Sequence, residues 1–324
     1  MKLVKTYGFL KKELDQIEAT LQDSIQATHP ILRKTSTQLL KAGGKRIRPV
    51  FVLLSSKLGE EDISEQAIHV AVSIELIHMA TLVHDDVIDH AFLRRGKPTI
   101  RSKYDNRVAM YTGDYILACA LESITNIQDP NLHQLLSDTI VELCIGEVEQ
   151  IHQKYMLDQN LRDYLRKIKR KTAILIAACC KLGALLAGKS AYISKQIYKY
   201  GYYVGMSYQI IDDILDFTAS EKQLGKPVGN DLIQGNVTLP ILKAMQNQEF
   251  KHLIEDIFAD SDEISNAQMQ LILAEMKKTD AIEASYELSR RYLSKALSTL
   301  ECIPDHYIKD IFIDIAKYIG NRRN

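Results

Sequence analysis

The sequence predicts an all-α protein that forms a single domain over residues 1–324, with roughly ten or more helices. Three observations support this prediction. Apolar residues recur every three or four positions, whereas alternation with a period of two is hard to find. Only 7 prolines occur, and none lies between Pro130 and Pro227, so the central stretch can be helical without interruption. The breaks between helical stretches are short and evenly spread.

Glycine, proline and polar residues mark the ends of the expected helices. Asp129 is a good N-cap, and Pro130 follows it at the first helical position. The next residues form one apolar stripe and predict a long helix: Leu132, Leu135, Leu136, Ile140 and Leu143. A second stripe, near the C-terminus, consists of Ile282, Tyr286, Leu293, Leu297 and Leu300. We expect breaks at Ala42–Gly44, Gly59–Asp62, Arg94–Pro98, Asn126–Pro130, Gly188–Ser190, Gly225–Asn236 and Asp260–Ser265.

The segment Ala173–Leu186 is apolar on nearly every face. Such a helix is expected at the centre of the protein, surrounded by other helices. Gly188 is expected to end this helix, and Arg170–Thr172 to begin it. An N-terminus at this place would favour an anion, because the backbone N–H groups and the helix dipole both attract negative charge.

Charge balance and cysteine usage exclude several classes of protein. The chain has 41 Lys+Arg and 41 Asp+Glu, and a formal net charge of zero argues against a nucleic-acid binder. The 5 cysteines include no CxxC pair, so neither a zinc ribbon nor a thioredoxin-type site is indicated. We expect these cysteines to be buried, reduced thiols.

The sequence predicts no membrane-spanning segment. Its first residues lack an uninterrupted apolar core and soon reach Glu13 and Asp15, unlike a signal peptide. The longest apolar stretch, Thr172–Ala187, is broken by Lys181 and is too short to cross a bilayer. We therefore expect a cytoplasmic protein.

Two aspartate clusters share the pattern DDxxD: DDVID at 85–89 and DDILD at 212–216. On a helix, residues i and i+4 lie on one face about 5–6 Å apart, so Asp85 with Asp89, and Asp212 with Asp216, present paired carboxylates. A solvated acidic patch would explain a lone cluster. Here, however, the flanking residues are Val, Ile and Leu, and burying adjacent like charges requires a counter-cation. The repeated cluster therefore predicts a cation site.

The ligand chemistry and four basic segments indicate a site for diphosphates. Carboxylate oxygens without histidine or thiolate suit Mg²⁺, which keeps several waters and binds phosphate oxygens as further ligands. The basic segments are GGKRIRP at 43–49, LRRGKPT at 93–99, RKT at 170–172 and GKP at 225–227. A single basic loop is usually a solvated turn. Two of the four follow the aspartate clusters closely, which favours clamps for two diphosphates.

These motifs resemble those of the all-trans polyprenyl diphosphate synthases. Besides the segments above, the matching motifs are HMATLVHDDVID at 78–89, GDY at 113–115, YQIIDDILD at 208–216 and LGKPVGND at 224–231. They cover nearly the whole chain, and together they are highly specific. Within the family, the stretch that follows Leu93 is most similar to the catalytic component of two-component bacterial enzymes that make heptaprenyl diphosphate for menaquinone.

The resemblance implies an isoprenoid-synthase-type helical bundle around a central cavity. The implied enzyme is an Mg²⁺-dependent prenyltransferase that condenses an allylic diphosphate, such as farnesyl diphosphate, with successive molecules of isopentenyl diphosphate. The implied partner is a small helical regulatory subunit in a heterodimer, and release of the product implies at most peripheral membrane contact. A hexaprenyl or longer product within the same family stays open as an alternative.

The resemblance also implies a role for each matching residue. It assigns Asp85, Asp89 and Asp212 to Mg²⁺, with Asp216 in support, and it counts Lys171 with the first three as catalytic. The diphosphate of isopentenyl diphosphate would be held by Lys45, Arg48, His78 and Arg95. The allylic diphosphate would be held by Arg94, Lys171, Thr172, Gln209 and Lys226.

Three other interpretations remain open from the residues alone. Two ExxH pairs, Glu75/His78 and Glu149/His152, with Glu122 and Glu142 could form a di-iron carboxylate site in a helical bundle. His84 and Asp85 could belong to a metal-dependent phosphohydrolase, although only His252 and His306 follow residue 152. A non-catalytic subunit of prenyltransferase type would be expected to have lost its aspartates, and both clusters are intact here.

Overall fold

The structure is a computed structural model that describes residues 2–59, 62–94, 96–220, 227–260, 264–304 and 307–322. It confirms the all-α prediction. The first half contains α1 (Lys2–Phe9), α2 (Lys11–Ser24), α3 (Pro30–Lys41), α4 (Ile47–Ser56), α5 (Glu65–Ile88), β1 (Leu93–Arg94), β2 (Lys97–Pro98), α6 (Ile100–Lys103), α7 (Asn106–Glu122) and α8 (Pro130–His152). Helix α9 (Leu161–Ile168) continues through a π-helical turn (Lys169–Ala173) into α10 (Ile174–Leu186).

The second half is also helical. Its elements are α11 (Ala191–Thr218), α13 (Asn230–Ile233), α14 (Leu239–Ala244), α15 (Gln248–Asp260), α16 (Asn266–Met276), α17 (Ala281–Thr299), a 3₁₀ turn (Leu300–Cys302) and α18 (Tyr307–Gly320). The chain divides into two compact units. The first comprises Met1–Leu136, Ala178–Tyr198 and Cys302–Phe312, and the second comprises Ser137–Ala177, Lys199–Glu301 and Ile313–Asn324. The single domain with a central cavity stays a prediction.

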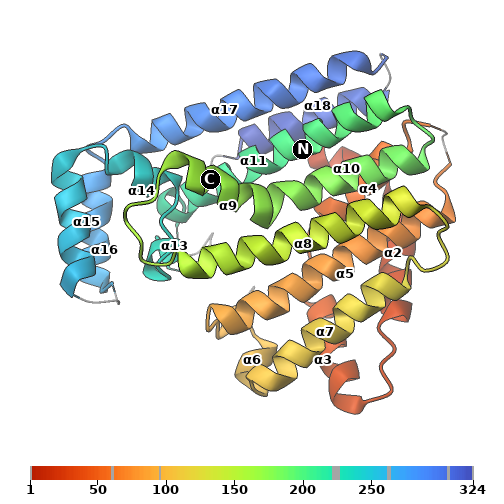
Figure 1. The fold of residues 1–324 in the computed structure, drawn as a ribbon, viewed down its shortest axis with the longest axis horizontal. Coiled ribbons are helices and arrows are strands. Elements are labelled where there is room, and N and C mark those ends of the chain that lie inside the picture. The colour runs from red at the N-terminus through yellow and green to blue at the C-terminus, as the bar shows by residue number, and fades with distance from the viewer. Residues whose placement is uncertain are drawn as a thin grey trace. The chain divides into compact units, whose positions relative to one another are not determined.

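Helix α5 is the core of the first unit, where it packs against α2, α4 and α7 (Figure 1). Its first turn is capped by the side chain of Ser64, which accepts a hydrogen bond from the N–H of Ala67 at 3.2 Å. A helix this long and apolar would be able to cross a membrane by length and composition, but 72% of the relevant window is buried inside the protein. Sequence analysis considered only Thr172–Ala187 as a possible span and did not single out α5, whose apolar residues are interrupted by His69, Glu75 and His78.

Two apolar clusters form the core of the second unit. One joins α9 to the C-terminal part of α11 through residues such as Tyr164, Ile168, Met206 and Ile210. The other holds α15 and α16 together, and these helices lie side by side in Figure 1. Gly205 allows α11 to approach the π-helical turn, since a Cβ at this position would lie 2.6 Å from the Cα of Ala173.

Most local predictions about helix ends are confirmed. The carboxylate of Asp129 accepts hydrogen bonds from the N–H groups of Asn131 and Leu132, at 2.9 and 3.4 Å, and α8 begins at Pro130. Gly188 follows the end of α10 and has a φ of +63°, which is typical of a glycine that terminates a helix. The buried residues of α10 confirm a helix that is surrounded by others.

Three expectations need correction. Cys119, Cys179 and Cys180 are buried free thiols, but Cys302 is half-buried and Cys144, on α8, is exposed. The expected break at Arg94–Pro98 contains a short antiparallel hairpin, in which Leu93 pairs with Pro98 and Arg94 with Lys97. Arg170–Thr172 does not begin a helix, because these residues lie inside a continuous helical run, within its π-helical turn.

Candidate active site

The first aspartate motif lies at the C-terminal end of α5. Asp85 and Asp86 belong to the last helical turn, Asp89 is the C-cap residue, and its N–H donates to the carbonyl of Asp85 at 2.8 Å. His90 then adopts a left-handed conformation with φ +52°. Carboxylates are disfavoured at this end of a helix, because the exposed carbonyls carry negative partial charge. The location at a helix C-terminus is therefore a second reason to expect a cation here, in addition to the repulsion between the carboxylates.

The middle aspartate of this motif turns away from the other two. Asp86 is 5% exposed, and its carboxylate accepts a hydrogen bond from Nε of Arg94 at 2.8 Å. Burial raises the pKa of Asp86, while the charge of Arg94 opposes this shift. Asp85 and Asp89 are half-buried. The motif is thus divided into two carboxylates suited to a ligand and one that fixes the following hairpin.

A recess in the first unit adjoins this motif. It is lined by residues that include Gly43, Arg46, Glu75, His78, Met79, Asp86, Arg94, Lys97 and Pro98. The recess therefore brings together His78 and Arg94, which sequence analysis placed on different diphosphates. Lys97 was not singled out individually, although it belongs to the basic hairpin. Gln38 also lines the recess and donates from Nε2 to the carbonyl of Pro98 at 3.1 Å.

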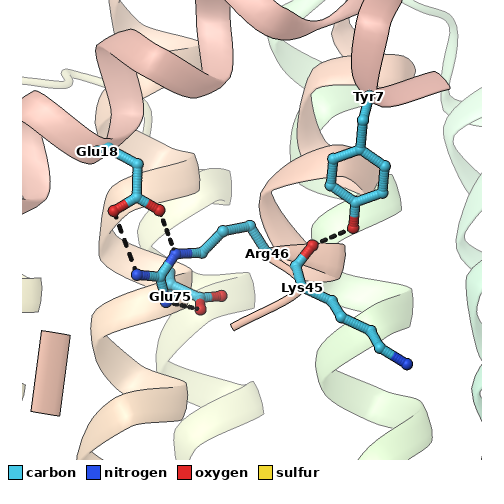
Figure 2. Close-up of polar contacts among 5 residues, drawn as sticks. All are labelled: Tyr7, Glu18, Lys45, Arg46 and Glu75. Carbon is cyan, nitrogen blue, oxygen red and sulfur yellow. Dashed lines mark hydrogen bonds and ion pairs between the residues drawn. The ribbon is translucent and has the colours of Figure 1, made fainter. Parts of the chain in front are cut away.

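The segment 43–49 places its three basic residues differently. Arg46 stands at the N-cap of α4, is 8% exposed and has a left-handed backbone with φ +46°. Lys45 is exposed, and its carbonyl accepts a hydrogen bond from the hydroxyl of Tyr7 (Figure 2). Arg48 is half-buried, and its Nε is buried without a hydrogen-bond partner among the described residues. Of the three basic residues, Arg46 is thus the one that is buried, whereas Lys45 is exposed and Arg48 is half-buried.

The GDY motif supports the first aspartate motif from α7. A Cβ on Gly113 would lie 2.3 Å from Nε2 of His84, so a larger residue here would displace the imidazole from its present position. The same nitrogen lies 3.2 Å from a carboxylate oxygen of Asp114. Gly113 and Asp114 therefore hold the residue that immediately precedes Asp85. This packing role is what the structure shows for His84, in place of the phosphohydrolase interpretation.

The second aspartate motif lies near the C-terminal end of α11. The carboxylate of Asp212 is 34% exposed and lies 2.8 Å from Nη1 of Arg322. The guanidinium of Arg322 also covers the ring of Tyr208, with 4.7 Å between Cζ and the ring centroid. Asp212 is therefore accessible, but its negative charge is already matched by a cation from the C-terminal segment.

The middle aspartate of the second motif is buried in a network of neutral donors. Asp213 is 2% exposed and accepts hydrogen bonds from the hydroxyl of Tyr164 at 2.7 Å and from Nε2 of Gln209 at 2.8 Å. Burial is the main cause that raises its pKa to about 7, and the charge of Asp231 adds to the shift. The two donors and Lys167 act in the opposite direction.

Asp216 anchors the segment that follows α11. It is fully buried, and its carboxylate accepts a hydrogen bond from the N–H of Asp231, at the start of α13, at 3.0 Å. Its own carbonyl accepts from the N–H of Gly229 at 2.8 Å. Gly229 has a φ of +71°, and a Cβ there would lie 2.6 Å from the sulfur of Met269. Asp216 thus has a structural role that sequence analysis did not foresee.

The RKT segment presents its side chains from the π-helical turn. Nζ of Lys171 donates to Oε1 of Gln150 at 2.9 Å, and the hydroxyl of Thr172 donates to Oε1 of Gln209 at 2.6 Å. Arg170 points elsewhere, toward the carboxylates of Glu142, at 3.0 Å, and Glu149. A π turn in a helix frequently marks a functional site, because the extra residue changes the direction of the side chains. It brings Lys171 and Thr172 next to residues of α8 and α11.

Sequence analysis missed Tyr164 and Lys167. Lys167 is 6% exposed, donates to the carbonyl of Val237 at 3.0 Å, and has a pKa that burial lowers. A signal was present, because positions 164, 167, 168 and 171 share one helix face. Two predicted ligands, Arg95 and Lys226, lie outside the described residues.

By ligand type, Asp85 and Asp89 at the end of α5 suit a hard divalent cation, and so, separately, does Asp212 in α11. All three offer carboxylate oxygens that are at least partly accessible, the ligands that Mg²⁺ and Ca²⁺ prefer. Within the described part of the chain, no three or more His, Cys, Asp or Glu residues gather as a metal-binding group. Three of the four glutamates of the di-iron interpretation are held by arginines instead: Glu75 by Arg46, and Glu142 and Glu149 by Arg170. This pairing argues against a di-iron site.

Comparison with known proteins confirms the family resemblance that the sequence motifs indicated. Residues 29–276 match the family model described as polyprenyl synthetase. The chain is 55% identical to heptaprenyl diphosphate synthase component 2 of Bacillus subtilis, with 100% of this chain and 92% of the relative covered. It is 53% identical to the protein of that name from Geobacillus stearothermophilus, with 99% of each chain covered.

Solved structures show the same similarity. The crystal structure of heptaprenyl diphosphate synthase from Staphylococcus aureus is similar to this chain with a TM-score of 0.92 and 42% identity, covering 97% of this chain and 99% of that one. A polyprenyl synthase from Caulobacter crescentus, complexed with calcium and isoprenyl diphosphate, has a TM-score of 0.93 and 27% identity, covering 98% of this chain and 97% of that one.

Proposed function

We propose that this chain, which belongs to the polyprenyl synthetase family, makes heptaprenyl diphosphate from an allylic diphosphate and successive molecules of isopentenyl diphosphate. The chain is a trans-prenyltransferase, and members of its family are generally metal-dependent. The observation that carries the proposal is the repeated DDxxD motif, whose first aspartates are accessible while the middle ones are buried. Farnesyl diphosphate is the proposed primer, and the proposed product serves menaquinone synthesis.

The proposed metal is Mg²⁺, held by Asp85, Asp89 and Asp212, with Asp216 supporting the site through the segment that it anchors. Bound Mg²⁺ supplies positive charge that stabilises a diphosphate as it leaves. The ends of α5 and α11 supply the negative charge that such a site requires. Asp86 and Asp213 are proposed to stay out of the metal shell, since each is committed to other partners.

The basic residues are proposed to hold the two substrates. Lys45, Arg48, His78 and Arg95 bind the diphosphate of isopentenyl diphosphate, and Arg94, Lys171, Thr172, Gln209 and Lys226 bind the allylic diphosphate. The C–O bond of the allylic substrate breaks, and the diphosphate leaves with the electron pair. The double bond of isopentenyl diphosphate then attacks the allylic cation, and a proton is lost to the released diphosphate. Apolar helix faces exclude water from the cation.

The proposal includes a partner, a small helical subunit that forms a heterodimer with this chain. The relatives named component 2 support this, and so does an apolar stripe on α8. Val141, Ile145 and Val148 are 54%, 40% and 55% exposed at spacings of four and three residues. Exposed apolar faces of this kind mark protein interaction sites. We further propose that the enzyme acts in the cytoplasm, with at most peripheral membrane contact as the product leaves.

One assay tests the proposal. Purified protein is incubated with Mg²⁺, farnesyl diphosphate and radiolabelled isopentenyl diphosphate, with and without the candidate partner, and the products are sized. The expected result is a seven-unit product that requires Mg²⁺ and is made fully only with the partner. A six-unit or longer product would support the alternative within the same family. No incorporation of label under any condition would contradict the assigned reaction.

A further inference from the structure

Arg46 is enclosed by carboxylates from two other helices (Figure 2). Its Nε and Nη2 lie 2.5 and 3.2 Å from the two carboxylate oxygens of Glu18, on α2, and its Nη1 lies 2.9 Å from Oε1 of Glu75, on α5. Paired hydrogen bonds of this type fix the plane of the guanidinium as well as its position. Arg46 is 8% exposed and Glu75 is 4% exposed. The side chain of Glu18 is 40% exposed, so the contact has a buried end at Glu75 and an accessible end at Glu18.

The charges show that Arg46 does not bind a diphosphate itself. Two carboxylates surround one guanidinium, so the local charge is negative and would repel an anion. Its neighbours in the sequence differ in this respect. Lys45 is exposed, and Arg48 has a buried Nε without a hydrogen-bond partner in the part of the chain that the structure describes. In the sequence, Arg46 therefore lies between Lys45 and Arg48, which carry donors for an anion, although Arg46 itself cannot bind one.

The backbone at Arg46 is in a conformation that a non-glycine residue rarely adopts. With φ 46° and ψ 36° it lies in the left-handed region, where the Cβ is crowded by the following carbonyl. Such a conformation persists only where the surroundings enforce it. The ion pairs to α2 and α5 hold the side chain, and the hydroxyl of Tyr7, on α1, holds the preceding carbonyl of Lys45. Three helices thus determine the direction of the chain between Lys45 and α4.

We propose that Arg46 is a positioning residue, which holds Lys45 and Arg48 in the geometry that binds the diphosphate of isopentenyl diphosphate. This inference rests on the proposed function. We call the ion pairs of Arg46 with Glu18 and Glu75 the Arg46 clamp. Arg46 and Glu75 also line the recess that contains His78, so the clamp forms part of the wall beside one of the proposed ligands of isopentenyl diphosphate. Lys45 and Arg48 are both assigned to isopentenyl diphosphate, so a loss of the clamp should weaken the binding of that substrate. Arg94, which also lines the recess, is held by Asp86 and not by Arg46, so binding of the allylic diphosphate should be almost unchanged.

The test compares Arg46→Lys and Glu75→Gln with wild type. Lysine keeps the charge but cannot form the paired contact, and glutamine keeps the shape of Glu75 but removes its charge. We expect KM for isopentenyl diphosphate to rise about tenfold in each variant, with KM for farnesyl diphosphate and kcat within about twofold. The double variant should be little worse than either single variant, because both act through one contact. Titration calorimetry with isopentenyl diphosphate alone should show the same loss of affinity.

Controls separate the possible failures. Arg291→Lys makes the same change in an exposed ion pair, with Glu287, and should have no effect. Glu18→Gln removes the charge at the accessible end of the clamp. If Arg46→Lys does not fold, the KM of Glu18→Gln for isopentenyl diphosphate tests the inference in its place. If Lys45→Ala weakens isopentenyl diphosphate binding and the clamp variants do not, the inference is wrong and the proposed function stands. If Lys45→Ala has no effect on that binding, the diphosphate assignment fails, and the inference with it.

Discussion

The ends of α5 and α11 carry the same DDxxD spacing but connect it to different surroundings. At the end of α5, the middle aspartate forms an ion pair with Arg94, whose side chain is 32% exposed. At the end of α11, the middle aspartate contacts the neutral donors of Tyr164 and Gln209 and is almost completely buried. The first connection is electrostatic and close to solvent, whereas the second is a buried hydrogen-bond network.

The difference extends to the residues that each middle aspartate controls. Asp86 fixes Arg94 in the hairpin after α5, and through it one wall of the recess. Asp213 fixes the amide of Gln209, whose oxygen in turn accepts a hydrogen bond from the hydroxyl of Thr172. One motif therefore orients a charged side chain and the other orients a chain of neutral groups. A repeated sequence motif does not imply repeated electrostatics.

The largest effect is expected where the two motifs are alike, at their first aspartates. Asp85→Asn and Asp212→Asn should each lower kcat by roughly 10²–10³ or more, because each removes charge that holds metal at the leaving diphosphate. Steady-state assays at saturating Mg²⁺, with circular dichroism to verify the fold, measure the effect. Asp86→Asn is the matched control and should reduce kcat far less. Near-wild-type turnover in either first-position variant would contradict the metal assignment.

The middle aspartates should differ in their contribution to stability. Asp213→Asn places an amide opposite two donors and leaves one of them unsatisfied, which should lower the free energy of unfolding by about 1–3 kcal/mol. Asp86→Asn removes an ion pair with a partly exposed arginine and relieves repulsion from Asp85 and Asp89, so a change within about 1 kcal/mol is expected. Urea denaturation of both variants measures the difference. Equal losses in the free energy of unfolding would mean that the Asp86–Arg94 ion pair and the hydrogen bonds of Asp213 contribute equally to stability.

Sequence analysis succeeded where the signal was local. Apolar periodicity predicted the helices, and the preferences of Asp129 and Gly188 predicted two of their ends. The paired aspartates predicted a cation site from charge alone, and that site stays a prediction. These inferences need only the neighbours along the chain, because helix faces and caps are determined within a few residues.

What the sequence could not show depends on tertiary contacts. Three basic residues in segment 43–49 look equivalent, but Arg46 points inward because Glu18 and Glu75 lie on helices distant in sequence. The π-helical turn places Lys171 and Thr172 inside a helix, where sequence analysis expected a helix N-terminus. Which aspartate of each motif turns inward likewise depends on partners such as Arg94 and Tyr164.

The buried network should also give the protein a pH dependence. The pKa of Asp213 is about 7 in the folded state, against an ordinary value of 3.8. Between these values the folded protein keeps a proton that the unfolded chain has lost. The free energy of unfolding therefore falls as pH rises through this window, by up to about 1.4 kcal/mol per pH unit.

Asp213→Asn should remove this contribution, so its free energy of unfolding should depend less steeply on pH than that of wild type. Denaturation series from pH 5 to pH 7 in metal-free buffer provide the measurement. Asp86→Asn is the comparison. Burial raises the pKa of Asp86 as well, but the charge of Arg94 opposes that shift, so this variant should change the pH dependence less. If Asp213→Asn leaves the pH dependence of the free energy of unfolding unchanged, the carboxyl of Asp213 is ionised in the folded protein throughout this pH range.

The smallest expected effect concerns the C-terminal segment, which contacts the second motif. Arg322 lies 2.8 Å from the carboxylate of Asp212, and its side chain is 17% exposed. A cation that binds Asp212 must compete with this guanidinium. Because a partly exposed ion pair contributes up to about 1 kcal/mol, Arg322→Ala should lower the Mg²⁺ concentration for half-maximal activity by up to about fivefold.

Calorimetric titration with Mg²⁺ in the presence of inorganic pyrophosphate should show the same gain in affinity without turnover. Arg290→Ala is the matched control, since it removes an arginine from an exposed ion pair with Glu283 and leaves Asp212 untouched. A lower affinity in Arg322→Ala would mean that the guanidinium assists the bound diphosphate instead of competing with the metal. An unchanged affinity would mean that the C-terminal segment does not hold Asp212 in solution, so that the carboxylate is as available as those at the end of α5.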